Sequence, residues 1–360
     1  MHRFFRTPRL LVAGLAVVAI AAAGAVATGA AASGAKQYTV HNLVSDQPGV
    51  ADWTDPNLVN AWGIAAGPTT PWWVNDNGTD VSTLYNGDGV PQPAGSPLVV
   101  SVVGGPTGIV FNGGTGFVVS KEGSSGPARF MFATEAGKIR GWSPAVPPPP
   151  LSTQSFVVVN RSDEGAVFKG LAILGDRIYA TDFHNAKVDV FDSKFHQVQG
   201  GFVDPSLPKG FAPFGIQAIG NNIFVTYAKQ DADAHDEVDG QGLGFVDEYS
   251  ADGTLITRVA SRGHLNAPWG VALAPRNFGF AGGDLLVGNF GDGRINAFGA
   301  LFQPVGRLLG TDGKPLTIDG LWGIGFGNGS GSGDTNDLYF AAGPDGEMHG
   351  LFGEISASGG

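Results

Sequence analysis

The sequence has 360 residues, including 58 glycines, 23 prolines and no cysteine, so disulfides, thiolate metal sites and thiol nucleophiles are excluded. Acidic residues outnumber basic residues by 32 to 21, and the net charge of −11 disfavours nucleic acid and anionic lipid as partners. Charged residues make up only 15% of the chain, and this glycine-rich composition suits a turn-rich all-β domain.

Residues 1–32 have the pattern of a secretory signal peptide. Three arginines in the first nine residues precede an uncharged run from Leu10 to Ala32, which is rich in small residues at its end. An uncleaved membrane anchor is the alternative, because about 20 apolar residues can span a bilayer. The many alanines and glycines favour cleavage. We therefore expect a secreted protein that leaves the membrane and has a mature net charge of −14.

A short pattern in which glycine introduces an apolar run recurs six times. The six glycines are 45, 62, 45, 55 and 53 residues apart, which is typical of four-stranded propeller blades. Each copy is followed by an apolar strand, a polar turn and a strand that ends near an aromatic residue, as in Ile178–Asp192. We predict an all-β, six-bladed β-propeller that occupies residues 33–360. The six glycines are Gly63, Gly108, Gly170, Gly215, Gly270 and Gly323.

The last blade lacks an outer strand of its own, because the chain ends soon after Leu351–Ile355. The mature N-terminus offers one in Tyr38–Val44. Pairing these two segments would close the ring and remove two open sheet edges. We therefore predict that the N-terminal strand belongs to the last blade.

Six literal motifs are distinctive: NLVSDQPG (Asn42–Gly49), DPNLVNAWG (Asp55–Gly63), TYAKQDAD (Thr226–Asp233), NAPWG (Asn266–Gly270), GNFGDG (Gly288–Gly293) and DGLWG (Asp319–Gly323). They resemble an uncharacterised family of exported bacterial β-propeller proteins, and the likeness covers essentially the whole mature chain. The blades are more distantly similar to NHL repeats and to six-bladed lactonases. The resemblance implies the fold and no established activity. Some family members carry a C-terminal sorting anchor, and the end of this sequence in Ser-Gly-Gly points to release.

Propeller geometry brings two sets of polar residues to one mouth of the channel: those before each inner strand and those in the turn between strands two and three. Carboxylates and carboxamides suit Ca²⁺, the one candidate cofactor, or a saccharide. Asp and Asn are also common turn formers, so only their convergence indicates a site. The turn set includes Asp76, Asn77, Glu135, Asp182, His184, Asn185, Asp231, Asn289 and Asp292. The predicted ligand-binding residues are Asn60, Lys169, Asp182, Asn266, Asn289 and Asp319.

Four of the residues that directly precede a repeat glycine are distinctive. Trp62, Trp269 and Trp322 are expected to pack between neighbouring blades rather than to stack on a ligand. Lys169 stands where these blades carry an aromatic residue. It is a candidate contact for an anionic group, and an ordinary ion pair is the alternative.

The fourth blade carries an insertion, Lys229–Gly240, with five acids and one histidine. Its alternating acids begin like a Ca²⁺ loop and predict Asp231, Asp233 and Asp236 as metal ligands, although no Glu closes the motif. A solvated acidic loop is the alternative. His235 and, in another turn, His184 are candidate proton acceptors because imidazole titrates near neutrality.

Two hypotheses of function follow. The first is a secreted, monomeric binding scaffold that holds an unknown small molecule, saccharide or protein at this mouth. The alternative is a divalent-metal-dependent hydrolase of lactonase or esterase type, with metal ligands among the residues predicted for the mouth. Lactonases have a Glu before the first inner strand, where this chain has Asn60, and no G-x-S-x-G motif is present. A quinone-dependent dehydrogenase would need channel histidines that the sequence does not place.

Overall fold

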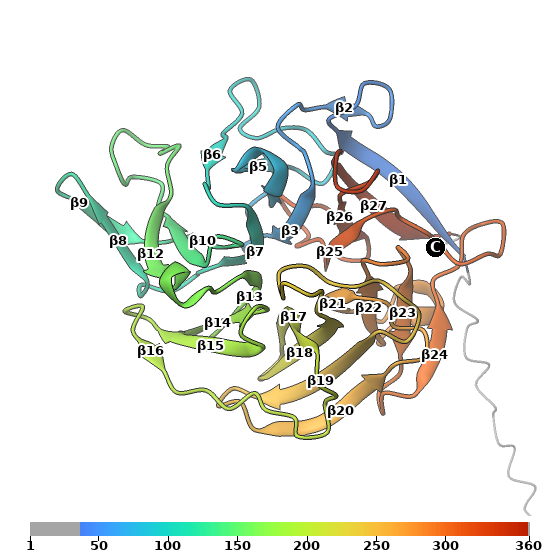
Figure 1. Ribbon diagram of the computed structural model, residues 1–360. Coiled ribbons are helices and arrows are strands. Elements are labelled where there is room, and N and C mark those ends of the chain that lie inside the picture. The colour runs from blue at the N-terminus through green and yellow to red at the C-terminus, as the bar shows by residue number, and fades with distance from the viewer. Residues whose placement is uncertain (1–36, 359–360) are drawn as a thin grey trace, which may run out of the picture. The chain divides into compact units, whose positions relative to one another are not determined.

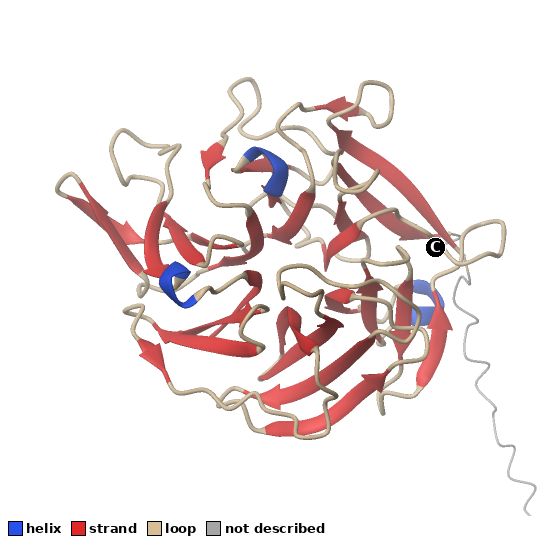
Figure 2. Cartoon of the chain, viewed as in Figure 1, coloured by secondary structure: helices blue, strands red, loops and turns tan. Residues whose placement is uncertain are grey.

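A computed structural model describes residues 37–358, which form a six-bladed β-propeller around a central channel (Figure 1). Strands dominate, and the helices of these residues are three single 3-10 turns: η1 (Asn77–Thr79), η2 (Ser162–Glu164) and η3 (Gly279–Ala281) (Figure 2). None of them has the length or apolarity to cross a membrane. The predicted signal peptide, residues 1–32, lies outside the described residues.

The first three blades follow one another along the chain. Blade 1 comprises β3 (Ala61–Ala65), β4 (Trp72–Asp76), β5 (Val81–Tyr85) and β6 (Val100–Ser101). Blade 2 comprises β7 (Pro106–Phe111), β10 (Phe130–Thr134), β11 (Lys138–Trp142) and β12 (Phe156–Asn160). Blade 3 comprises β13 (Phe168–Leu174), β14 (Arg177–Asp182), β15 (Lys187–Asp192) and β16 (Gln197–Val198).

The other three blades complete the ring. Blade 4 comprises β17 (Phe211–Ile219), β18 (Asn222–Lys229), β19 (Gly244–Ser250) and β20 (Leu255–Ser261). Blade 5 comprises β21 (Pro268–Leu273), β22 (Leu285–Asn289), β23 (Ile295–Phe298) and β24 (Pro304–Arg307). Blade 6 comprises β25 (Leu321–Phe326), β26 (Leu338–Ala342), β27 (Leu351–Ala357), β1 (Tyr38–Ser45) and the short β2 (Trp53–Thr54).

The N-terminal strand closes the ring in the last blade, which confirms the prediction. β1 runs antiparallel to β27, with Val40 opposite Ile355. The hydroxyl of Tyr38 donates to the carbonyl of Phe278 at 3.1 Å and accepts from the amide of Ala281 at 3.2 Å, so this strand is also tied to blade 5. Two features were not expected: β2, which extends blade 6 in parallel, and the hairpin of β8 (Val118–Lys121) and β9 (Ser124–Pro127) inserted in blade 2.

The glycine of the repeat lies where neighbouring inner strands approach most closely. A Cβ atom at Gly323 would be 2.8 Å from the carbonyl oxygen of Trp62, and one at Gly270 would be 2.6 Å from that of Trp322. A Cβ at Gly170 would be 2.9 Å from the carbonyl oxygen of Phe214. Real Cβ atoms are not found this close to backbone oxygens. The repeat therefore specifies a tight ring of inner strands that other residues would force apart.

The three tryptophans form a single cluster at the start of the inner strands. Trp62 and Trp322, from adjacent blades, are stacked with their ring centroids 3.7 Å apart, as expected for packing between neighbours. Trp269, however, contacts Trp62 edge-on across the intervening blade, at 6.4 Å. Phe290 stacks on the other face of Trp322 at 3.9 Å. This aromatic cluster lies at the end of the channel where the inner strands begin, which we call the upper mouth.

Candidate functional site

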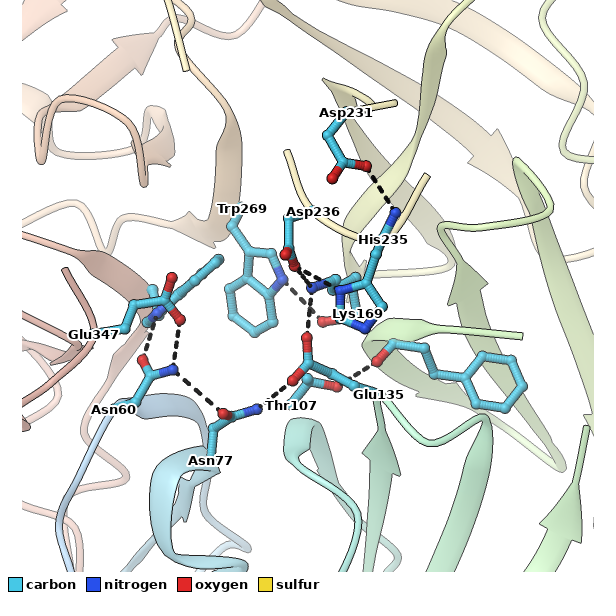
Figure 3. A network of polar contacts seen from close by, with 12 residues as sticks. Asn60, Asn77, Thr107, Glu135, Lys169, Asp231, His235, Asp236, Trp269 and Glu347 are labelled. Atoms are coloured by element: carbon cyan, nitrogen blue, oxygen red, sulfur yellow. Dashed lines mark hydrogen bonds and ion pairs between the residues drawn. The ribbon is translucent and has the colours of Figure 1, made fainter. Parts of the chain in front are cut away.

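Side chains from all six blades meet at the upper mouth (Figure 3). Four of them lie in the turn between the second and third strand of a blade. Asn60 directly precedes the inner strand of blade 1, and Lys169 and Trp269 lie on inner strands. This is the arrangement that propeller geometry predicts for one face of the ring. In blade order, the residues are Asn60 and Asn77, Glu135, Lys169, Asp236, Trp269 and Glu347.

The ammonium of Lys169 is the centre of this network and is only 1% exposed. Its Nζ lies 2.5 Å from Oε1 of Glu135 and 3.0 Å from Oδ1 of Asp236, and it stands 5.2 Å from the ring centroid of Trp62. Burial alone would lower the pKa of this ammonium, but the surrounding carboxylates, Glu135 foremost, raise it above its usual value. Lys169 is therefore a fixed cation.

A chain of carboxamides extends the network towards blade 6. Nδ2 of Asn77 donates to Oε2 of Glu135 at 2.9 Å, and Nδ2 of Asn60 donates to Oε2 of Glu347 at 2.6 Å. A longer contact of 3.4 Å joins Asn60 to Oδ1 of Asn77. The indole of Trp322 donates to Oδ1 of Asn60 at 3.0 Å, which anchors this chain on the aromatic cluster. The packed aromatic cluster therefore holds this part of the polar network in place.

Carboxyl groups outnumber the ammonium that faces them. Burial raises the pKa of Glu237 to about 8, although Lys169 lowers it, and the nearby acids Glu347 and Asp239 raise it further. Burial also raises the pKa of Glu347, against the effect of its hydrogen bond from Asn60. Burial is the main cause of both shifts. The carboxyl groups of Glu135, Asp236 and Glu347 face the single ammonium of Lys169, so acidic groups exceed the positive charge at the upper mouth. Such a cleft attracts cations.

The three predicted metal ligands of the fourth-blade insertion make different contacts. Oδ1 of Asp231 accepts a hydrogen bond from the amide of His235 at 2.9 Å, and Asp233 is exposed. Among the described residues, the side chains whose ligand atoms lie within 4.8 Å of one another are Glu135, His235 and Asp236. Nδ1 of His235 is 2.9 Å from Oδ1 of Asp236. Because this donor set includes an imidazole, it suits Mn²⁺ or Zn²⁺ better than Ca²⁺.

The other predicted site residues make local contacts. Asp182 is buried and its Oδ1 accepts from the amide of Asn185 at 3.2 Å, while His184 beside it is exposed. Nδ2 of Asn289 donates to Oδ1 of Asp292 in its own turn at 2.9 Å. These contacts serve the turns themselves, as Asp and Asn commonly do.

Two predicted residues instead fix loops at the upper mouth. Oδ1 of Asn266 accepts from the amide of Gly240 at 2.6 Å and so ties the fourth-blade insertion to blade 5. Oδ2 of the exposed Asp319 accepts from the amide of Asp345 at 2.9 Å, in the loop that carries Glu347. Their role in this structure is to position the loops.

Sequence reasoning did not single out Glu347 or Glu237 as site residues. Glu347 lies in the turn between β26 and β27, which is equivalent to the turns that supply Asn77 and Glu135. Assigning that turn in the last blade would have identified it. Glu237 was seen only as one acid of a charged loop.

Comparison with known proteins places the chain in a family. It is 36% identical over 329 residues to the uncharacterized protein R648 of Acanthamoeba polyphaga mimivirus, covering 88% of this chain and 80% of that protein. It is also 34% identical over 334 residues to the uncharacterized mimivirus protein L690, covering 88% and 85%. The chain belongs to the family of these mimivirus proteins. No known family model matches the sequence. Because these relatives are viral, a bacterial origin stays a prediction.

Solved structures share the fold at low identity. A protein of unknown function from Bacteroides thetaiotaomicron superposes with a TM-score of 0.56 at 13% identity, covering 89% of this chain and 76% of that one. A catalytically inactive virginiamycin B lyase from Staphylococcus aureus with quinupristin gives 0.50 at 13% identity, covering 89% and 99%. At this identity the likeness shows the propeller fold alone.

Proposed function

We propose that the protein is an exported, monomeric binding propeller whose upper mouth holds a positively charged group of a small molecule, a saccharide or a protein partner. The observation that supports this proposal is the convergence of polar side chains from six blades on one buried ammonium, Lys169. A network that only closed the channel would need matched charges. Here the acids Glu135, Asp236 and Glu347 share that ammonium.

A ligand cation would relieve this excess of negative charge. The carboxyl groups of Glu237 and Glu347 are partly removed from water, so a cation that pairs with their ionised forms would interact more strongly than on an open surface. Trp269 adds a half-buried aromatic face, and its indole donates to the carbonyl of Lys169 at 3.0 Å, which fixes the ring. Such a ring can stabilise an organic cation.

Isothermal titration with CaCl₂ and with spermidine tests this proposal. We expect the wild-type protein to bind at least one of these probes and the double variant Glu135→Gln/Asp236→Asn to lose at least tenfold in affinity. Asp176→Asn is the matched control, because Asp176 is an exposed acid in the hairpin at the other end of blade 3. Equal affinity in the double variant and the control, or no binding of either probe at millimolar concentration, would contradict the proposal.

Export is proposed from residues 1–32 alone. Expression of the whole chain with its own N-terminus should release a protein into the medium that begins near residue 33. A full-length chain retained with the cell membrane would instead favour the uncleaved anchor.

A second candidate function is a metal-dependent hydrolase, and the grouping of Glu135, His235 and Asp236 favours it. These residues would hold a divalent metal, which would activate water for attack on an ester or a lactone. The metal would have to share two carboxylates with Lys169. Turnover of p-nitrophenyl acetate or δ-valerolactone with Mn²⁺ or Zn²⁺, and its loss in His235→Ala, would support this candidate. No metal-dependent turnover would reject it.

A further inference from the structure

A cavity of about 480 Å³ opens at the lower mouth, where the inner strands end, away from the polar network. All six blades contribute to its wall through two or more of the four positions that follow the repeat glycine. The side chains that form it are almost entirely apolar. The apolar lining residues include Ile64, Phe111, Ile173, Ile219, Leu273 and Phe326.

The channel above this cavity is nearly closed. It narrows to a space of about 30 Å³ between Gly63, Gly270 and Gly323, with Trp269 among its lining residues. That space has room for only one or two water molecules. A molecule that entered from below would therefore stop beneath the ring of glycines. The lower cavity and the upper mouth are separate compartments of opposite polarity.

Two carboxamide side chains interrupt the apolar wall, and the first is Gln217. The position two residues after the glycine is Ala65, Val110, Ala172, Ala272 and Gly325 in five blades, and in blade 4 it is Gln217. Gln217 is exposed and lines both the cavity and the narrow space above it. Its carboxamide can donate and accept a hydrogen bond.

The other carboxamide at this wall is already engaged. Nδ2 of Asn328 donates to the carbonyls of Gly67 at 2.7 Å and Thr70 at 2.9 Å. Its Oδ1 accepts from the amides of Ser330 and Ser332. Asn328 therefore holds its own loop, and Gln217 is the group at this wall that a ligand can address.

We propose that the lower cavity is a second binding site, for a small molecule with an aliphatic body and one uncharged hydrogen-bonding head group, such as a medium-chain alcohol. The volume falls within the usual range for small-molecule pockets, roughly 300–1,000 Å³, and such pockets pair apolar walls with few polar groups. No Lys, Arg or His lies among the described residues that line this cavity, so nothing there compensates an anionic head group. The aliphatic body would cover Leu273, which is 53% exposed.

Titration with 1-octanol tests this site, with octanoate as the charged counterpart, and binding is followed by calorimetry and by the fluorescence of Trp72, which lines the cavity. We expect octanol to bind more tightly than octanoate. Gln217→Leu should weaken octanol binding about fivefold, the effect of one neutral hydrogen bond. Leu273→Arg should abolish it, because the variant places a charge at the rim.

Ile256→Arg is the matched control, because Ile256 is 50% exposed on the outer strand β20 and lies outside the cavity. Equal octanol affinity in Leu273→Arg and Ile256→Arg, or octanoate binding as tight as octanol binding, would overturn the inference. The double variant Glu135→Gln/Asp236→Asn should bind octanol normally. The two proposed sites can therefore fail independently.

Discussion

Gly323 in blade 6 lies so close to Trp62 in blade 1 that a Cβ atom on the glycine would stand 2.8 Å from the tryptophan carbonyl oxygen. The same relationship links Gly270 to Trp322. Close contacts of this kind therefore recur between neighbouring inner strands. They determine the diameter of the channel and the height at which the channel narrows.

Gly323→Ala should lower the free energy of unfolding by about 2 kcal/mol or more, because backbone atoms on both strands would have to move. Urea denaturation followed by tryptophan fluorescence measures this change. Gly113→Ala is the control, since a Cβ at the exposed Gly113 meets Phe111 at an ordinary 3.4 Å. Similar stability of the two variants would show that close strand contact is not what the repeat glycine provides.

Removal of the closing strand should weaken the whole ring. Deleting Tyr38–Val44 would expose the edge of β27, so we expect a sharp fall in the melting temperature measured by circular dichroism. The point variant Tyr38→Ala should cost about 4 kcal/mol, because it removes a buried aromatic side chain and the two hydrogen bonds of its hydroxyl. A truncated protein that melts normally would contradict closure by β1.

Lys169→Met should destabilise the protein at pH 7 by about 3 kcal/mol, because it leaves Glu135 and Asp236 without their ammonium. The cost should shrink as the pH falls towards about 4, where carboxylates become protonated. In the double variant Lys169→Met/Glu135→Gln, part of the stability should return at pH 7. Chemical denaturation at the two pH values measures both effects, and a pH-independent cost would mean that only packing was lost.

The fold was predictable because each blade repeats one local rule: a glycine, an apolar inner strand and a turn-forming second hairpin. The hairpin of β8 and β9 was not, since it is an insertion outside the repeat, visible only as the longest glycine spacing of 62 residues. The closing strand was predictable from the missing partner of Leu351–Ile355. The backbone groups at a sheet edge need hydrogen-bond partners, and a sequence reveals when a blade lacks the strand that would supply them.

The location of the candidate site at one mouth of the channel could be predicted from the sequence, but only some of its residues could. Lys169 stood out because it replaces an aromatic residue of the repeat, and the structure makes it the centre of the network. Asp236, which pairs with Lys169, was grouped with Asp231 and Asp233, because the alternation of acids along the loop suggested that they share a metal ion. The loop instead turns back on itself, with the amide of Asp231 donating to the carbonyl of Asp236 at 2.8 Å. Such a path depends on tertiary contacts rather than on local pattern.

Stability should depend on pH through Glu237. Burial raises its pKa to about 8 in the folded protein, so the folded state binds this proton more tightly than the unfolded state. The stability that this tighter proton binding contributes is fully present below the pKa of Glu237 in the unfolded state. It is lost as the pH rises from about 4.5 to about 8. Glu237→Gln should flatten this part of the stability profile. A wild-type protein equally stable at pH 5 and pH 8, or an unchanged profile in the variant, would contradict the assignment.

The most direct test of the cation site is the number of protons released when a cation binds at pH 7. A cation bound beside Glu237 competes with the proton of this carboxyl, whose pKa burial raises to about 8. Titrations of spermidine or CaCl₂ in two buffers with different ionisation enthalpies should therefore reveal proton release. In Glu237→Gln the release should fall while binding persists. Binding with no proton release, or release that is unchanged in Glu237→Gln, would place the cation elsewhere and contradict the account.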